Sequence, residues 1–74
     1  MRITVRPIGV IRKYANGQEL EVTRGLTSRQ LIETLGGIPK KLKMVSYVNG
    51  KKKDLDDELE DGDEIKLVTM LTGG

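Results

Sequence analysis

The pattern of apolar and polar positions predicts two short strands in the first third of the chain. In RITVRPI, Ile3 and Val5 alternate with polar neighbours, which is the period-two pattern of a half-buried strand. QELEVTR alternates in the same way, with Leu20 and Val22 expected on the buried face. The connection between them ends in Asn16-Gly17, a dipeptide typical of tight turns. We therefore expect an antiparallel pair of strands joined by a long loop.

The stretch GLTSRQLIETLGG predicts a helix over residues 28–35. Thr27 stands at the N-cap position and Gln30 follows three residues later, which is the spacing of a capping box. An apolar stripe at helical spacing is formed by Leu31, Ile32 and Leu35. Gly36 is expected to end the helix in a left-handed conformation.

The last third of the chain predicts a hairpin, an acidic connector and a final strand. KMVSYV reads as a strand, Asn49-Gly50 as a turn, and the three lysines that follow as a short edge strand. In the connector LDDELEDGD, Leu55 and Leu59 are four residues apart, so a single helical turn is expected to hold it against the core. EIKLVTML is apolar on both faces towards its end, which favours a central strand.

This order of elements predicts an α+β fold, with one main helix on one face of a mixed sheet of four to five strands. The first and last strands are both apolar enough to be central. If they are parallel neighbours, the crossover between them places the helix on the sheet, and the fold is a β-grasp. The expected core residues are Val5, Leu20, Leu31, Leu35, Ile65 and Leu67.

Composition then narrows the class of function. With 74 residues the chain is expected to form a single domain over residues 1–74, with a flexible tail at about residues 71–74. It contains no Cys and no His, so we expect no disulfide, no metal site and no enzymatic activity of its own. The acidic connector does not fit a calcium-binding loop, because Leu59 and Val68 fall where oxygen ligands are required. With no membrane-spanning run and no signal peptide, a cytoplasmic protein is expected.

Charge is divided unevenly along the chain. Residues 1–53 hold twelve Lys or Arg and three Asp or Glu, whereas residues 54–74 hold one Lys and eight Asp or Glu. A basic cluster is formed by Lys40, Lys41, Lys43, Lys51, Lys52 and Lys53. This cluster can bind an acidic protein partner, with Lys51, Lys52 and Lys53 as the docking residues, or it can consist simply of solvent-exposed lysines without a binding role. Nucleic-acid binding is less favoured, because only Tyr47 is near enough to stack on bases.

The sequence finishes with TMLTGG, and two glycines after an apolar strand add no packing. They suit a different use, in which the terminal carboxylate is the working group. A carboxylate must be activated before it reacts, for example as an acyl-adenylate, and side chains near it would obstruct a narrow enzyme channel. No other set of reactive side chains in the chain competes with this carboxylate.

The order of elements, the length, the GLTSRQLIETLG helix and the ending DGDEIKLVTMLTGG resemble the ThiS/MoaD family of ubiquitin-like sulfur carriers over essentially the whole chain. The resemblance implies that a ubiquitin-activating-type enzyme adenylates the carboxyl of Gly74 with ATP. Sulfur then converts it to a thiocarboxylate, which donates sulfur to a biosynthetic enzyme. Gly73 would be the required neighbour, and Thr72, Leu71 and Met70 would line the partner's channel. The chain itself would bind no cofactor.

The pathway remains open at this point, with molybdopterin, thiamine and thiolated tRNA as the candidate products. Relatives that act as protein modifiers attach to lysines through the same diglycine, so conjugation is the main alternative. A basic nucleic-acid-binding β-grasp module is a further alternative. The sequence does not separate sulfur donation from conjugation, because both begin with the same activated glycine.

Overall fold

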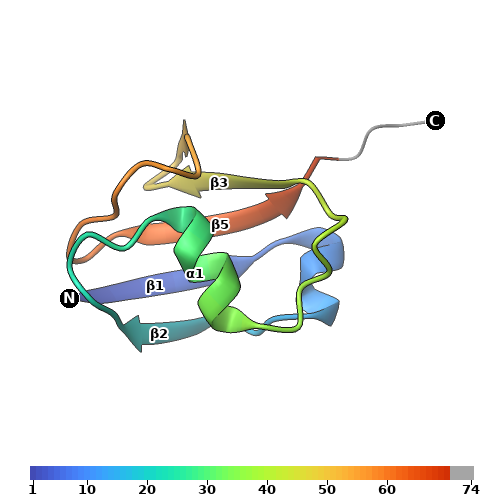
Figure 1. Cartoon of the computed structure of the whole chain (residues 1–74), viewed down its shortest axis with the longest axis horizontal. Coiled ribbons are helices and arrows are strands. Elements are labelled where there is room, and N and C mark those ends of the chain that lie inside the picture. The colour runs from blue at the N-terminus through green and yellow to red at the C-terminus, as the bar shows by residue number, and fades with distance from the viewer. Residues whose placement is uncertain (71–74) are drawn as a thin grey trace.

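The computed structural model describes residues 1–70, in which a sheet of five strands carries one α-helix on one face (Figure 1). The strands are β1 (Arg2–Pro7), β2 (Gln18–Glu21), β3 (Met44–Val48), β4 (Lys51–Lys53) and β5 (Glu64–Thr69). The helices are α1 (Ser28–Leu35) and the short 3-10 helix η1 (Gly9–Lys13). Residues 71–74, which the sequence predicts to be a flexible tail, lie outside the described residues.

The sheet has the order β2-β1-β5-β3-β4, with β1 and β5 parallel and the other pairs antiparallel. The parallel pair places Val5 opposite Ile65 and Pro7 opposite Leu67. The first and last strands are therefore the central neighbours that the sequence predicted, and the β-grasp fold is confirmed. Because β1 and β5 run in the same direction, both strands end at the same edge of the molecule.

The core lies between α1 and the sheet. Its buried apolar residues are Ile3, Val5, Ile11, Leu31, Val48, Leu59, Ile65 and Leu67. Four of the six predicted core residues are among them. The other two, Leu20 and Leu35, are only partly buried and pack against the core from its rim. Ile11 was not predicted to be buried, yet its side chain is completely inaccessible to solvent.

The predicted helix has the predicted bounds because its start and stop are encoded locally. The backbone N–H of Gln30 donates to the Thr27 hydroxyl (3.2 Å), and the backbone N–H of Thr27 donates to the Gln30 side chain (3.0 Å). This reciprocal pair is the capping box. Gly36 ends the helix with a φ of 66°, as expected, but its ψ of 168° is extended, so it is not in the left-handed helical region.

The two Asn-Gly dipeptides behave differently. Asn49 and Gly50 have φ values of 52° and 86° and form the turn between β3 and β4, as predicted. The prediction of a tight turn at Asn16-Gly17 is wrong, because neither residue has a positive φ. The connection from β1 to β2 is instead built around η1, where the amides of Tyr14 and Ala15 donate to the carbonyl of Ile11 (2.9 and 3.0 Å).

The predicted helical turn in the acidic connector is also wrong. The amide of Asp57 donates to the carbonyl of Asp54 (3.1 Å), which closes a single turn, and no helix forms. Backbone partners distant in sequence hold the segment in place. The amide of Leu59 donates to the carbonyl of Leu26 (2.8 Å), and the amide of Arg29 donates to the carbonyl of Leu55 (2.9 Å). An isolated β-bridge joins Thr27 and Glu58. Leu59 is nevertheless buried, so the connector is held against the core as expected.

Candidate functional site

The central strand β5 carries the chain to the edge of the sheet from which the candidate tail departs. Its last residue, Thr69, is paired with Met44 of β3. The next residue, Met70, has an amide that donates to the carbonyl of Lys43 (2.9 Å) and is 50% exposed. This bond ties Met70, the last described residue, to the loop of residues 36–43.

A groove of about 930 Å³ runs from Met70 along one side of α1. The helix contributes Arg29, Ile32 and Glu33, which share one face because they are three or four residues apart, and Gly36 lines the groove just after the helix ends. The apolar lining from the rest of the chain is Ile38, Pro39, Leu42, Met44 and Leu55. Lys40 and Lys43 also line it, so the groove combines an apolar floor with cationic groups close to Met70.

A second, smaller hollow of about 390 Å³ lies where β1 passes into η1. Its lining includes Arg6, Ile8, Arg12 and Asn16. The N-H of Ile8 donates to the carbonyl of Leu67 on β5 (2.9 Å), which ties this segment to the same edge of the sheet as Met70.

The structure separates the basic cluster of the sequence into two groups. Lys40, Lys41 and Lys43 lie in the loop that binds the amide of Met70. The second group, Lys51–Lys53, forms the edge strand β4, where Lys53 pairs with Ser46 and Lys51 with Val48. In the register of β3, Met44 is the residue next to the end of β5, so the β4 lysines lie farther from Met70. Docking through Lys51–Lys53 stays a prediction.

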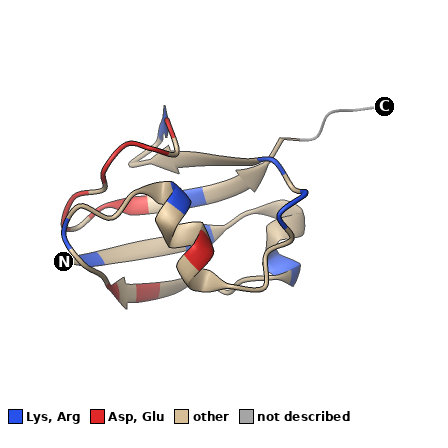
Figure 2. Ribbon diagram, in the orientation of Figure 1, with Lys and Arg blue, Asp and Glu red and all other residues tan. Residues whose placement is uncertain are grey.

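The acidic connector lies away from Met70, towards the end of the molecule that holds the N-terminus (Figure 2). Arg29 donates two hydrogen bonds to Asp56, of 2.7 and 3.2 Å. The hydrogen bond from Arg29, helped by its positive charge, holds the pKa of Asp56 below its ordinary value. The side chain of Arg29 has a raised pKa for the same reason. Both side chains are mostly exposed, so this pair anchors α1 to the connector only weakly.

Asp63 is the buried carboxylate of this region, and its oxygens are satisfied by hydrogen bonds. It accepts from the Asn49 side chain (2.9 Å) and from the amide of Glu60 (2.8 Å). The Asn49 side chain also accepts from the amide of Glu64 (3.0 Å). The contacts lock the connector onto the β3–β4 turn and explain the burial of Asp63 without a catalytic role.

The described chain, residues 1–70, contains no group of three or more Asp, Glu, His or Cys side chains placed to hold a metal ion. Nor does this part of the chain contain a helix long and apolar enough to span a membrane. Of the predicted site residues, Met70 is placed at the base of the tail. Leu71, Thr72, Gly73 and Gly74 lie outside the described residues.

Comparison with known proteins extends these observations. The model of the ThiS family matches residues 5–74. A search of curated proteins found no significant match.

Solved structures with the same fold include SAMP1, the small archaeal modifier protein 1, from Haloferax volcanii, at 16% identity and a TM-score of 0.74, with all of both chains covered. A candidate molybdopterin converting factor subunit 1 from Pyrococcus furiosus has 24% identity and a TM-score of 0.75, covering 90% of this chain and 94% of that one. The complex of subunits 1 and 2 of molybdopterin-converting factor from Helicobacter pylori includes a chain with 25% identity and a TM-score of 0.69, with all of both chains covered.

Proposed function

Because the chain belongs to the ThiS family, we propose that it is a ubiquitin-like sulfur carrier whose working group is the carboxylate of Gly74. The observation that carries this proposal is the family match, which extends through the diglycine to residue 74. The geometry supports it, since Met70 follows the end of the central strand β5, is half exposed, and donates its amide to the carbonyl of Lys43.

The chemistry takes place in two steps on a partner enzyme. In the first, a carboxylate oxygen of Gly74 attacks the α-phosphorus of ATP, pyrophosphate leaves, and an acyl-adenylate forms. In the second, a hydrosulfide-equivalent donor attacks the carbonyl carbon, AMP leaves, and a thiocarboxylate remains. In this role the chain is a substrate of other enzymes and binds no cofactor of its own. The need for ATP favours the cytoplasm as its place of work.

Two glycines at the tip suit this use because they have no side chains to obstruct the passage to a buried nucleotide. Met70, Leu71 and Thr72 would occupy the outer part of that passage. The second partner is an enzyme that accepts the sulfur. The likeness to a subunit of the Helicobacter pylori complex supports a paired biosynthetic subunit as that acceptor. Molybdopterin synthesis is accordingly the first pathway to test, ahead of thiamine and tRNA thiolation.

Conjugation to protein lysines is the second candidate function, and the fold shared with SAMP1 is compatible with it. Both functions pass through the same acyl-adenylate and differ in the nucleophile that follows. A sulfur donor gives a thiocarboxylate, whereas a lysine amine gives an isopeptide bond to Gly74.

Intact-mass spectrometry tests the proposal. The full chain is incubated with the adenylating enzyme encoded in the same genome, ATP and sulfide. We expect a mass increase equal to the exchange of one oxygen for sulfur, and no exchange when Gly74 is deleted or Gly73 is replaced by Trp. Both variants should keep the unfolding free energy within about 0.5 kcal/mol of wild type, the usual range for surface changes. Equal sulfur uptake by the truncated chain would refute the role of Gly74.

A further inference from the structure

The end of the molecule at which β5 finishes also carries exposed apolar side chains. Among residues 1–70, the large hydrophobic side chains that remain exposed are Ile8, Val10, Tyr14 and Met70. They come from two distant parts of the sequence. The parallel pairing of β1 with β5 brings them to one end, because the segment that follows β1 begins where β5 finishes. Exposed apolar side chains at the end from which a reactive tail departs are suited to contact with a partner protein.

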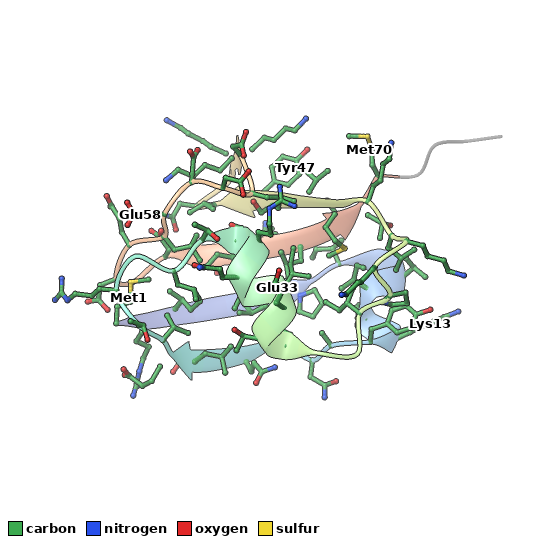
Figure 3. The ribbon with its side chains drawn as sticks, in the orientation of Figure 1. Met1, Lys13, Glu33, Tyr47, Glu58 and Met70 are labelled. Carbon is green, nitrogen blue, oxygen red and sulfur yellow. The ribbon has the colours of Figure 1, made fainter. Side chains whose placement is uncertain are left out.

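Positive charge gathers at the same end. The cations there are Arg12, Lys13, Lys40, Lys41 and Lys43. None of these five lies within ion-pairing distance of a carboxylate in the described chain, whereas Arg2, Arg6 and Arg29 are all paired. Figure 3 shows Met70 and Lys13 at one end of the molecule and Met1 and Glu58 at the other. Charge is therefore distributed unevenly along the sheet. The end at which the tail begins is cationic and carries exposed apolar side chains, and the opposite end is acidic.

The loop of residues 36–43 joins these groups into one surface. Its Lys43 carbonyl binds the amide of Met70, and its Gly37 approaches the carbonyl of Tyr14, to which a Cβ on Gly37 would come within 3.7 Å. We call the four exposed apolar residues and the five cations the tail-end collar. The collar lies at the end of the molecule where β5 finishes, and three of its residues, Lys40, Lys43 and Met70, also line the groove beside α1.

We propose that the tail-end collar docks on an acidic, partly apolar rim around the channel by which the adenylating enzyme receives Gly74. This inference rests on the proposed function and adds the chemistry of the partner's surface. A cationic patch steers an encounter with an acidic one, and the apolar side chains then bury against the rim once the tail has entered. The collar thus positions the tail before any contact with the diglycine is made.

An acidic protein fits this surface better than a nucleic acid. Single-stranded nucleic acids are held by several aromatic side chains on which bases stack, and the collar offers only Tyr14. The collar is also a better docking surface than Lys51–Lys53, because the β4 lysines lie farther from Met70 in the register of β3.

Two triple variants with the same change in charge provide the test. The first is Lys40→Gln with Lys41→Gln and Lys43→Gln, and the second is Lys51→Gln with Lys52→Gln and Lys53→Gln. Each is assayed by ATP–pyrophosphate exchange with the adenylating enzyme of the same genome, over a range of carrier concentrations and of salt. Urea midpoints of both variants check that the fold is intact.

We expect the collar triple to raise the KM for the carrier roughly tenfold, at the lower end of the range over which charge steering acts, with kcat within about twofold. Its KM should also depend less on salt than that of the wild type. The β4 triple should raise KM less. Val10→Ser should raise KM with an unchanged salt dependence, because it removes an apolar contact and no charge.

The outcomes separate this inference from the proposed function. If the wild-type chain supports no exchange, the proposed function fails and the inference fails with it. If the wild type is active and the β4 triple raises KM as much as the collar triple, the collar is not the docking surface, while the proposed function stands. Competition between a single-stranded oligonucleotide and the enzyme for the wild-type chain would assign the collar to nucleic acid and overturn the inference.

Discussion

Replacing Ile11 with Ala should destabilise the fold more than any substitution in the surrounding connection. The side chain of Ile11 is fully buried, although it comes from a short 3-10 helix between two strands. The N-cap residue of that helix, Ile8, makes no side-chain capping hydrogen bond, and short 3-10 segments are weak on their own. The segment therefore depends on the burial of Ile11 for its position.

The magnitude follows from the burial. Removing three carbon atoms from a fully buried isoleucine costs about 2–5 kcal/mol, and Ile11→Val costs about 0.5–1.5 kcal/mol. A domain of 74 residues has a total stability of about 4–11 kcal/mol, from the usual range per residue. The alanine variant should thus lose a large share of the stability, and the valine variant gives a graded value if the alanine variant unfolds.

Urea unfolding followed by circular dichroism provides the measurement, with Val10→Ala as the matched control. Val10 is the neighbouring residue but is 38% exposed, so its truncation should change the unfolding free energy by no more than about 0.5 kcal/mol. The reasoning would be refuted if Ile11→Ala and Val10→Ala lost the same free energy. Such a result would mean that η1 is not held by its contact with the core.

Three further predictions concern the hydrogen bonds around the helix and the connector. Thr27→Ala removes half of the capping box and should cost about 0.5–2 kcal/mol in urea unfolding, whereas Thr23→Ala should cost little. Asn49→Ala leaves the buried carboxylate of Asp63 without one donor and should cost about 1–3 kcal/mol, with a shifted Glu64 amide resonance in NMR spectra as the local marker. The pKa of Asp56 is held below its ordinary value of 3.8, so its pairing with Arg29 should stabilise the fold above that pH and lose this effect as the pH falls further. The difference in urea midpoint between wild type and Asp56→Asn should therefore shrink on acidification. A difference that stays constant with pH would contradict the pairing.

The elements predicted best are those specified by neighbouring residues. The helix at residues 28–35 has its cap at Thr27 and its stop at Gly36, so its bounds need no tertiary information. The β3–β4 hairpin likewise forms at Asn49-Gly50, where both residues accept a positive φ.

The errors arose where distant partners decide the conformation. Asn16-Gly17 carries the same turn signal as Asn49-Gly50, but burial of Ile11 draws the preceding segment into η1 and the connection no longer needs a tight turn. Leu55 and Leu59 have helical spacing, but the chain makes a single turn at residues 54–57, and backbone hydrogen bonds with Arg29 and Leu26 hold the segment in that path without a helix. No local pattern contains these partners, so the pattern alone predicts the wrong local structure.

In the candidate site, too, the features specified by neighbouring residues are predictable from the sequence and those that depend on distant partners are not. The diglycine and the strand that precedes it are visible in the sequence. The tail-end collar is not, because it combines residues 8–14 with residues 40–43 and Met70. The parallel pairing of β1 with β5 and the hydrogen bond between Met70 and Lys43 bring them to one end of the molecule. The sequence predicted Lys51–Lys53 as the docking residues of the basic cluster. The structure instead places Lys40, Lys41 and Lys43 nearer to the tail, because the amide of Met70 donates a hydrogen bond to the carbonyl of Lys43.

The most direct test of the central claim is the chemical state of the C-terminal peptide after activation. Trypsin cleaves after Lys66 and releases the peptide LVTMLTGG, residues 67–74. After incubation with the adenylating enzyme, ATP and sulfide, we predict that this peptide contains sulfur in place of one carboxylate oxygen of Gly74, and that omission of ATP leaves it unchanged. A peptide that keeps its ordinary carboxylate under complete conditions, with an enzyme shown to be active on another carrier, would contradict the claim that Gly74 is the working group.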